Sequence, residues 1–304
     1  MVFLGLEILS ISTYVLAGFR REDLRSNESA LKYFLLGSLA SAFFLYGVAL
    51  IFGATGSTNL IAIADALANL QTQWSLVHLA AALMLIALCF KVAVAPFHIW
   101  TPDVYEGAPT PVTGFMSVGP KAAGFAVMLR VFMTAFTTLQ DRWSGAIWII
   151  AAITMVLGNV VAVVQPNMKR MLAYSSIAHA GYVAVALASG SAKGLSGAMF
   201  YLLGYSLMNL GAFTIVTLLG RKGDKLVQVS DYAGLASKRP GLAALLTLFL
   251  LSLAGIPGTV GFAGKFFIFR AAIESNLIGL AVIGVSATVV SFYYYLNEIG
   301  RAHV

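Results

Sequence analysis

The chain has 304 residues, of which 60% are hydrophobic and only 10% are charged, and its mean hydropathy is +0.88. A soluble domain of this length needs far more polar surface, so the composition indicates a protein of the lipid bilayer. The net charge of +7 would suggest nucleic acid for a soluble protein, but here the basic residues gather between apolar runs, so no nucleic-acid partner is expected. A single cysteine, Cys89, can neither hold an iron–sulfur cluster nor form an internal disulfide.

Apolar runs of spanning length recur along the chain. A helix that crosses a bilayer needs ~20 mostly apolar residues, and about nine stretches meet this requirement. They cover residues 1–19, 30–53, 76–98, 108–137, 144–165, 171–189, 195–220, 240–268 and 271–296. The apolar segment 60–70 is too short to span and predicts a helix at the membrane surface. The sequence therefore predicts an all-α polytopic membrane protein.

Basic residues are unevenly shared between the loops. The loops after the first, fifth and seventh spans hold Arg20, Arg21, Arg25, Lys169, Arg170, Arg221, Lys222, Lys225, Lys238 and Arg239. The loops on the alternate side hold only Arg142, Lys193 and Arg270. Because cytoplasmic loops carry the excess of Lys and Arg, the first set is predicted to face the cytoplasm.

The second and seventh spans resemble each other at a shift of 167 residues, which pairs Gly37 with Gly204 and Gly53 with Gly220. Because the partners lie five spans apart, an odd number, two copies would run in opposite directions through the bilayer, as in many transporters. We therefore predict inverted five-helix repeats. The alternative is chance similarity between Leu- and Gly-rich membrane helices.

Two prolines occupy corresponding places in the predicted repeats, Pro96 in the third span and Pro257 in the eighth. Proline lacks an N–H group, so each leaves a carbonyl one turn earlier unpaired. In hydrocarbon such a break persists where the freed backbone lines a polar cavity or finds other partners. Both spans are expected to be broken helices, although a packing kink is an alternative for either one alone.

Four ionisable residues lie inside predicted spans: Glu7, Lys91, Lys121 and Lys265. A charge at the bilayer centre costs ~2.5 kcal/mol or more, so such residues usually have a function. The alternative is that a lysine near a helix end extends its amine to the headgroups, and this stays open for Lys32 and Lys265. Lys91 and Lys121 lie too deep in their spans to do so readily.

Buried ionisable groups can pass protons. Burial disfavours the charged form, and an ion pair between Glu7 and Lys91 would favour it, so forming and breaking that pair would bind and release a proton. His179 and His98 are candidates to relay protons between lysines, or else to hydrogen-bond to a helix carbonyl. The polar run 174–182 around His179 could hold water. No histidine lies at ligand spacing from another, so no metal site is expected.

Residues 90–115 read FKVAVAPFHIWTPDVYEGAPTPVTGF and resemble the signature of the antiporter-like membrane subunits of respiratory complex I. The motif has the sequence typical of the N-type subunits. The L- and M-type subunits and the multi-subunit sodium/proton antiporters usually have WLPDAH where this chain has WTPDVY. Further similarity runs through FLGLEILS around Glu7, KRMLAYSSIAHAGY from Lys169 and LSLAGIPGTVGFAGKF from Leu251, and it extends to about Leu296.

The resemblance implies a polar axis inside the membrane. Carried over by position, Glu7 and Lys91 would form a pair in one half-channel, Lys121 a link, and Lys265 the terminal lysine. The family carries no cofactor, so quinone and NADH would be handled by other subunits, and the partners would be other membrane subunits of the complex and the lipid bilayer. The expected location is a bacterial cell inner membrane.

The resemblance also carries expectations about the ends of the chain. Residues 1–297 are expected to form one antiporter-like domain in which leading and trailing helices of the family are missing. Residues 298–304 resemble a translated sequencing adapter and are expected to be a non-native tail.

Three other functions are weighed against a complex I subunit. The runner-up is a subunit of a multi-subunit sodium/proton antiporter, which shares the fold and the lysines. The second is a stand-alone transporter of a small anion, and the third is a structural spacer. The TPD sequence at residues 101–103 argues against a stand-alone anion transporter. The energetic cost of charges inside the membrane argues against a structural spacer.

Overall fold

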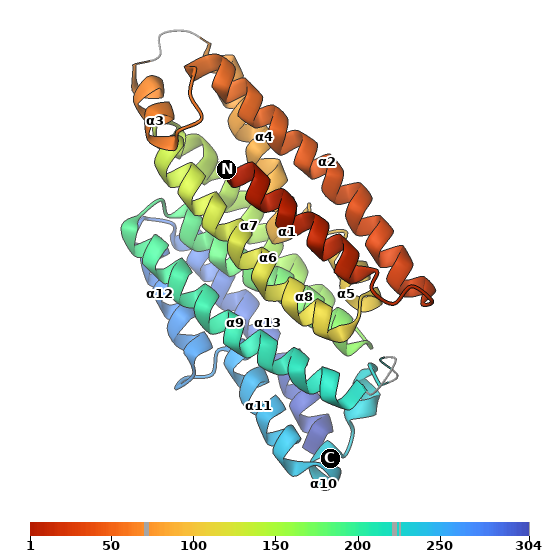
Figure 1. Cartoon of the computed structure of the whole chain (residues 1–304). Coiled ribbons are helices and arrows are strands. Elements are labelled where there is room, and N and C mark those ends of the chain that lie inside the picture. Colours follow the sequence, from red (N-terminus) through yellow and green to blue (C-terminus); the bar gives the residue numbers. More distant parts are fainter. Residues whose placement is uncertain (70–72, 221–223, 225, 304) are drawn as a thin grey trace.

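The computed structural model describes residues 1–69, 73–220, 224 and 226–303. Within these residues every regular element is a helix, and the long helices lie side by side in a bundle (Figure 1). The prediction of an all-α membrane protein is confirmed. Leu70, Arg221, Lys222, Lys225 and Val304, which entered the predictions above, lie outside the described residues.

The helices are α1 (Val2–Ala17), α2 (Leu24–Thr55), α3 (Leu60–Ala68), α4 (Trp74–Val92), α5 (Thr101–Gly107), α6 (Thr110–Arg130), η1 (Val131–Ala135), η2 (Thr137–Leu139), α7 (Gln140–Ala162), α8 (Met168–Ala188), α9 (Ala192–Gly220), η3 (Val229–Tyr232), α10 (Leu235–Lys238), α11 (Pro240–Ala254), α12 (Val260–Glu274) and α13 (Ile278–His303). Among the described residues, seven segments are long and apolar enough to cross a membrane. The helices α1 and α11 are apolar but shorter. A helix forms at α3 as predicted, and with nine residues it is too short to span.

Both broken helices are present, and they change two predicted boundaries. The third predicted span, 76–98, ends as a helix at Val92 and continues through an irregular link to α5. The eighth, 240–268, divides into α11 and α12 around Pro257, and α12 extends to Glu274. The ninth span therefore begins at Ile278 rather than at residue 271. The predicted boundary was wrong because residues 271–273 are apolar and continue the pattern of a span. The turn between α12 and α13 lies at Asn276, where φ is 59°.

The inverted repeat is visible in the order of the helices. A long helix, a broken helix and a further helix occur in the first half as α2, α4/α5 and α6, and again in the second half as α9, α11/α12 and α13. Arg20 just before α2 forms an ion pair of 2.9 Å with Asp224 just after α9. The start of α2 and the finish of α9 therefore lie at the same end of the bundle, so the two copies run in opposite directions.

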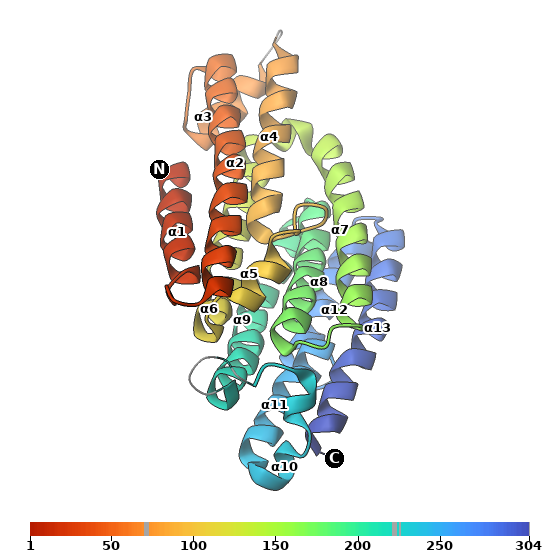
Figure 2. The same cartoon turned by 90° about the vertical axis from the view of Figure 1, so that its right-hand side faces the viewer.

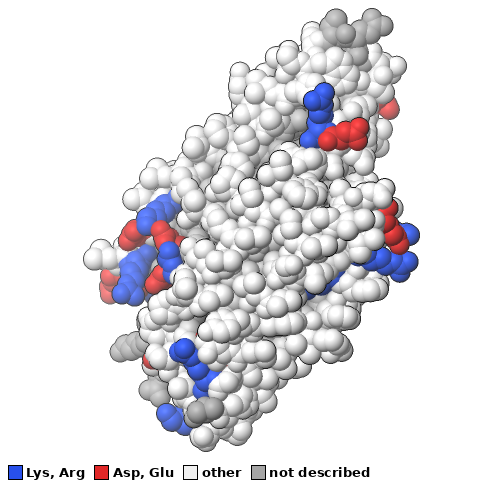
Figure 3. All heavy atoms as spheres, turned by 180° about the vertical axis from the view of Figure 1, so that it is seen from behind, with Lys and Arg blue, Asp and Glu red and all other residues white. Residues whose placement is uncertain are grey.

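Charged side chains gather at the ends of the bundle. We call one the Asp224 end, which holds Arg20, Asp224, Lys169, Arg170, Asp103, Glu106, Glu28 and Lys32, and the other the Glu274 end, which holds Lys193, Arg270 and Glu274. The face seen in Figure 3 is largely uncharged between such patches. The loops predicted to be cytoplasmic supply the Asp224 end, and the orientation itself stays a prediction.

Helix α8 forms the centre of the bundle. It packs against α5, α6, α7, α9, α12 and α13, and Figure 2 shows it between α5 and α7. Small residues allow the closest approach: a Cβ atom on Gly158 of α7 would lie 2.6 Å from the backbone nitrogen of Ala178. Polar side chains of α8 therefore lie in the part of the molecule farthest from lipid.

Asp224 joins three segments at its end of the bundle. Its carboxylate accepts hydrogen bonds from Arg20 and from the backbone N–H of Thr110, at 2.9 and 3.1 Å, and lies 3.5 Å from the Lys169 amine. Burial raises the pKa of the Asp224 carboxyl, but the Lys169 charge and the Arg20 hydrogen bond outweigh it and hold this pKa below the ordinary 3.8. Stabilisation by this carboxylate is therefore complete above pH 3.8 and is lost as the pH falls through the lower native-state pKa.

We expect Asp224→Asn to lower the melting temperature at neutral pH and to reduce the further loss of stability below about pH 4. Thermal unfolding in detergent over a pH series measures both effects. Asp65→Asn, at an exposed carboxylate of α3, is the matched control and should change little. An acid limb that is identical in the Asp224 variant and the parent would contradict this role.

Candidate functional site

Glu7 and Lys91 lie on neighbouring helices and line one narrow cavity between α1, α2 and α4. The Glu7 carboxylate accepts a hydrogen bond of 2.5 Å from the Ser41 hydroxyl, and the Lys91 amine donates to the Ser10 hydroxyl. The two charged groups share the cavity, but no ion pair within 4.0 Å joins them in the described structure. Each is instead held by a serine.

The position of Lys91 follows from the broken helix. Lys91 lies in the last turn of α4, and Ala93, the residue after this helix, is in the left-handed region with φ of 60°. A cation is favoured at the C-terminal end of a helix, where unpaired carbonyls carry partial negative charge. A Cβ atom on Gly124 of α6 would lie 3.4 Å from the Lys91 side chain, so glycine lets α6 pack closely over it.

Lys121 lies on α6 and is buried, with 3% of its surface exposed. Its amine donates to the Ser176 carbonyl at 2.7 Å and to the Ser176 hydroxyl at 2.6 Å. That hydroxyl also accepts a hydrogen bond of 2.9 Å from Tyr205 of α9. No carboxylate lies within 4.0 Å of Lys121 among the described residues, so neutral oxygens alone solvate the amine.

Lys265 uses the second helix break. Gly255, with φ of 90°, ends α11, and the freed carbonyls of Leu253 and Ala254 accept hydrogen bonds from the Lys265 amine at 3.2 and 2.9 Å. The amine also lies 4.7 Å from the centre of the Tyr182 ring, a favourable cation–π distance. The break thus supplies the partners that a buried lysine needs, and Lys265 does not extend to the headgroups.

His179 lies on α8 between the groups that contact the two lysines. Its Nδ1 atom is 2.5 Å from the Tyr201 hydroxyl and its Nε2 atom is 3.2 Å from the Tyr295 hydroxyl. Ser176, which binds Lys121, lies three residues before it, and Tyr182, which faces Lys265, lies three residues after. Positions three apart share a helix face, so one face of α8 connects Lys121 to Lys265.

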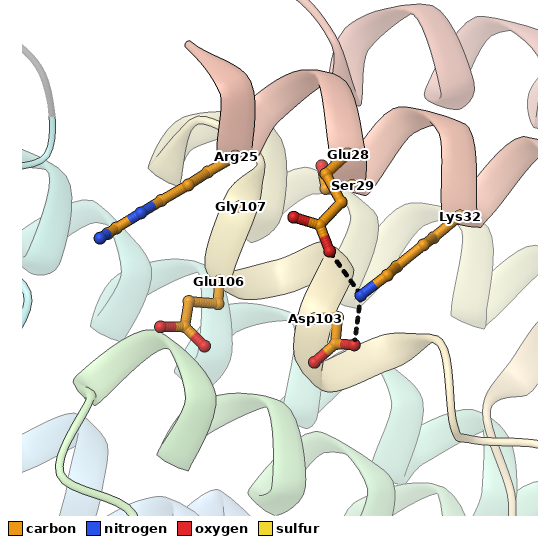
Figure 4. A pocket seen from close by; sticks show the side chains of 7 residues that line it. All are labelled: Arg25, Glu28, Ser29, Lys32, Asp103, Glu106 and Gly107. Atoms are coloured by element: carbon orange, nitrogen blue, oxygen red, sulfur yellow. Dashed lines mark hydrogen bonds and ion pairs between the residues drawn. The ribbon is translucent and has the colours of Figure 1, made fainter.

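The remaining predicted site residues lie elsewhere. His98 is in the link between α4 and α5, where its buried Nδ1 atom has no hydrogen-bond partner among the described residues. Lys32 lies at the Asp224 end and pairs with Glu28 and Asp103 at 2.7 and 3.0 Å (Figure 4). It therefore reaches the end of the bundle rather than the chain of buried lysines. Within the described residues no cluster of His, Cys, Asp or Glu could hold a metal ion.

The sequence pattern did not point to the tyrosines of α9 and α13. Tyr201, Tyr205 and Tyr295 are nearly fully buried and direct their hydroxyls to α8. The available signal was the pair of phenols four residues apart on α9, because positions i and i+4 share a helix face. Lys169 is a further buried cation that the site prediction left out; its amine donates to the carbonyls of Glu106 and Ala108 at 2.8 and 2.6 Å, at the end of α5.

Two broken helices and three lysines buried inside apolar helices define a polytopic membrane protein of the antiporter-like class. The family profile described as "NADH:quinone oxidoreductase/Mrp antiporter, TM" matches residues 1–291. The chain belongs to this family. Together with the seven segments of the described residues that are long and apolar enough to cross a membrane, this makes it a multi-pass protein of a bacterial inner membrane.

Named relatives define the similarity further. NADH-quinone oxidoreductase subunit N 1 of Solibacter usitatus (strain Ellin6076) is 55% identical over 297 residues, which are 98% of this chain and 61% of that protein. A chain in the structure of respiratory complex I from Thermus thermophilus with bound aureothin is 42% identical, with a TM-score of 0.85 over 99% of this chain and 64% of that chain. A chain of the Mrp complex from Dietzia sp. DQ12-45-1b gives a TM-score of 0.90 at 26% identity, over 99% and 56%. The present chain thus spans about three fifths of the length of the curated relatives it matches.

The two glycines of the second helix break allow a matched test. Gly255 and Gly258 both have φ near 90°, so alanine strains the backbone at either position by about 1–3 kcal/mol. Only at residue 255 would the new Cβ atom also meet Lys265, at 3.3 Å from its amine. We expect Gly255→Ala to destabilise the protein more than Gly258→Ala and to make the Lys265 amine more reactive towards an amine-specific reagent. Thermal unfolding and mass-spectrometric labelling measure the two effects, and equal behaviour of the variants would argue against the contact.

Proposed function

We propose that this chain is the proton-conducting part of an N-type membrane subunit of NADH:quinone oxidoreductase. The observation that carries the proposal is the chain of buried lysines: Lys91, Lys121 and Lys265 each lie inside the bundle and are solvated by serine hydroxyls or by freed backbone carbonyls. Ionisable residues within spanning helices are costly to bury, and they usually mark ion pathways. The identity of 55% to an N-type subunit supports the choice of subunit.

Each part of the site has a role in this function. Glu7 and Lys91 share one cavity, and a change in the charge of either alters the affinity of the other for its proton. Lys121 and Lys265 are joined through Ser176, His179 and Tyr182 of α8, a path on which histidine can relay protons. The breaks at Pro96 and Pro257 lie beside Lys91 and Lys265, where small helix movements would change the partners of each amine.

The chain itself is proposed to hold no redox centre and no cofactor. Quinone reduction and NADH oxidation would take place in other subunits, and the membrane partners would be further subunits of the same complex. Reduction elsewhere would then change the electrostatic field along the chain of lysines, and protons would move in response.

A subunit of a multi-subunit sodium/proton antiporter is the second candidate. It is favoured by the TM-score of 0.90 to the Mrp complex chain. The identity of 26% to that chain, against 42% to the complex I chain, makes it the weaker candidate. Sodium-dependent proton exchange in vesicles without quinone reduction would favour it.

We expect Glu7→Ala and Lys91→Ala, introduced separately into the assembled complex, to lower proton pumping and the coupled quinone reduction by at least about tenfold, since each removes one proton-transfer group. Dye-detected acidification of membrane vesicles and NADH-driven quinone reduction measure the two activities.

Arg142→Ala is the control, because Arg142 is an exposed residue near the start of α7. It should leave both activities close to those of the parent. Normal pumping in both the Glu7 and the Lys91 variant, with the complex assembled, would remove this mechanism.

A further inference from the structure

An open cavity of about 550 Å³ lies on the outer face of the bundle, between α9 and α12. The two helices approach closely at Gly197, where a Cβ atom would lie 3.5 Å from the backbone nitrogen of Ile268. Phe200 and Phe267 close the far end of the cavity, with ring centroids 5.3 Å apart. Phe200 follows Lys193 by seven residues, so the cavity extends about 10 Å along α9. Its inner part therefore lies at the depth of lipid acyl chains.

The mouth of this cavity is charged. Lys193 at the start of α9 and Arg270 near the end of α12 both line it. Both pair with the Glu274 carboxylate, at 2.8 and 3.0 Å. Two cations share one carboxylate, so the cluster has an excess of one positive charge. The two cationic side chains are 68% and 57% exposed, and exposed ion pairs are weak, so both cations can bind a further anion.

A second cavity lies on the other side of α12, against α13. It has a volume of about 730 Å³ and shares Arg270 with the first cavity. Most of its other lining residues are apolar, among them Phe269, Ile273 and Val289. Helix α12 thus has an apolar cavity on each side and a cation where the two cavities meet the Glu274 end. A phospholipid has the same plan, with one phosphate and two acyl chains.

The cavity drawn in Figure 4, at the Asp224 end, has the reverse charge balance. It is lined by two cations and three carboxylates: Arg25, Lys32, Glu28, Asp103 and Glu106. Its two other lining residues, Ser29 and Gly107, are small, so no apolar surface continues the charged mouth. An anionic lipid is therefore expected at α12 and not at the cavity of Figure 4.

We propose that α12 binds one molecule of phosphatidylglycerol, with the phosphate at Lys193 and Arg270 and one acyl chain in each cavity. Arginine binds phosphate oxygens through paired N–H donors, and lysine adds a point charge. Basic side chains at the membrane surface attract anionic headgroups. The excess of one positive charge matches one phosphodiester, whereas the ammonium group of a zwitterionic headgroup would cancel the attraction. The bound lipid would hold α12, the helix that carries Lys265, against α9 and α13.

Photocrosslinking tests the site in phosphatidylcholine vesicles that contain the full-length protein in its native assembly. The probe is a phosphatidylglycerol with a diazirine on one acyl chain, and it is compared with a phosphatidylcholine that carries the same chain. After irradiation, mass spectrometry measures the labelling of residues 192–200 and 262–273. We expect the phosphatidylglycerol probe to label them at least about fivefold more than the phosphatidylcholine probe, since each Lys or Arg near an anionic headgroup contributes an attraction of that order.

Three variants should change this preference in different directions. Lys193→Gln leaves the Arg270–Glu274 pair intact and removes the excess charge, so the preference for phosphatidylglycerol should fall about fivefold. Glu274→Gln increases the excess charge and should raise the preference. Arg142→Gln removes one positive charge at an exposed position outside both cavities, and it should leave the preference unchanged.

Equal labelling of the parent protein by the two probes would overturn the proposal, and this comparison needs no variant. Stronger labelling by the same probe built on phosphatidylethanolamine would also overturn it, as would a loss in Lys193→Gln no greater than that in Arg142→Gln. The labelling does not depend on proton pumping, so its failure leaves the function proposed above intact. Normal pumping in the Lys91 and Glu7 variants would, in turn, leave the lipid site standing.

Discussion

The structure depends on how a bundle of apolar helices solvates charges that it cannot expose to water. A buried amine needs oxygen partners, and the chain supplies them in two ways. Ser10 and Ser176 offer hydroxyls to Lys91 and Lys121. For Lys265 the partner is the backbone itself, because the break after α11 leaves carbonyls that no helical N–H takes up. The helix break and the buried lysine thus satisfy each other's hydrogen-bonding groups.

The same reasoning explains why α8 carries the centre of the site. It is the most enclosed helix, so its polar groups cannot find lipid headgroups and must find each other. Ser176, His179 and Tyr182 follow one another on one face and contact groups on α6, α9, α12 and α13. Lys169, at the start of this helix, binds the last carbonyls of α5 in the way that Lys265 binds those of α11. Carbonyls at the ends of α5 and α11 therefore each bind a buried lysine, Lys169 and Lys265 respectively.

Much of this could be predicted from the sequence because the signals were local. Apolar run length gave the helices, Pro96 and Pro257 marked the breaks, and the charges within apolar runs singled out Lys91, Lys121 and Lys265. What could not be predicted lies between segments distant in the chain. Tyr295 reaches His179 across 116 residues, and the boundary near Asn276 depends on one turn within an apolar run. Glu7 and Lys91 share the expected cavity, but their serine partners were not evident from the residue pattern.

The most direct measurement of the central claim is infrared difference spectroscopy on the assembled complex with isotope-labelled lysine, comparing the resting state with turnover. If protons pass along the buried amines, ammonium bands of lysine change during turnover, and the band absent from a Lys121→Arg variant identifies that residue. A spectrum in which no lysine changes its protonation while the complex pumps would contradict the idea that these buried amines carry the protons.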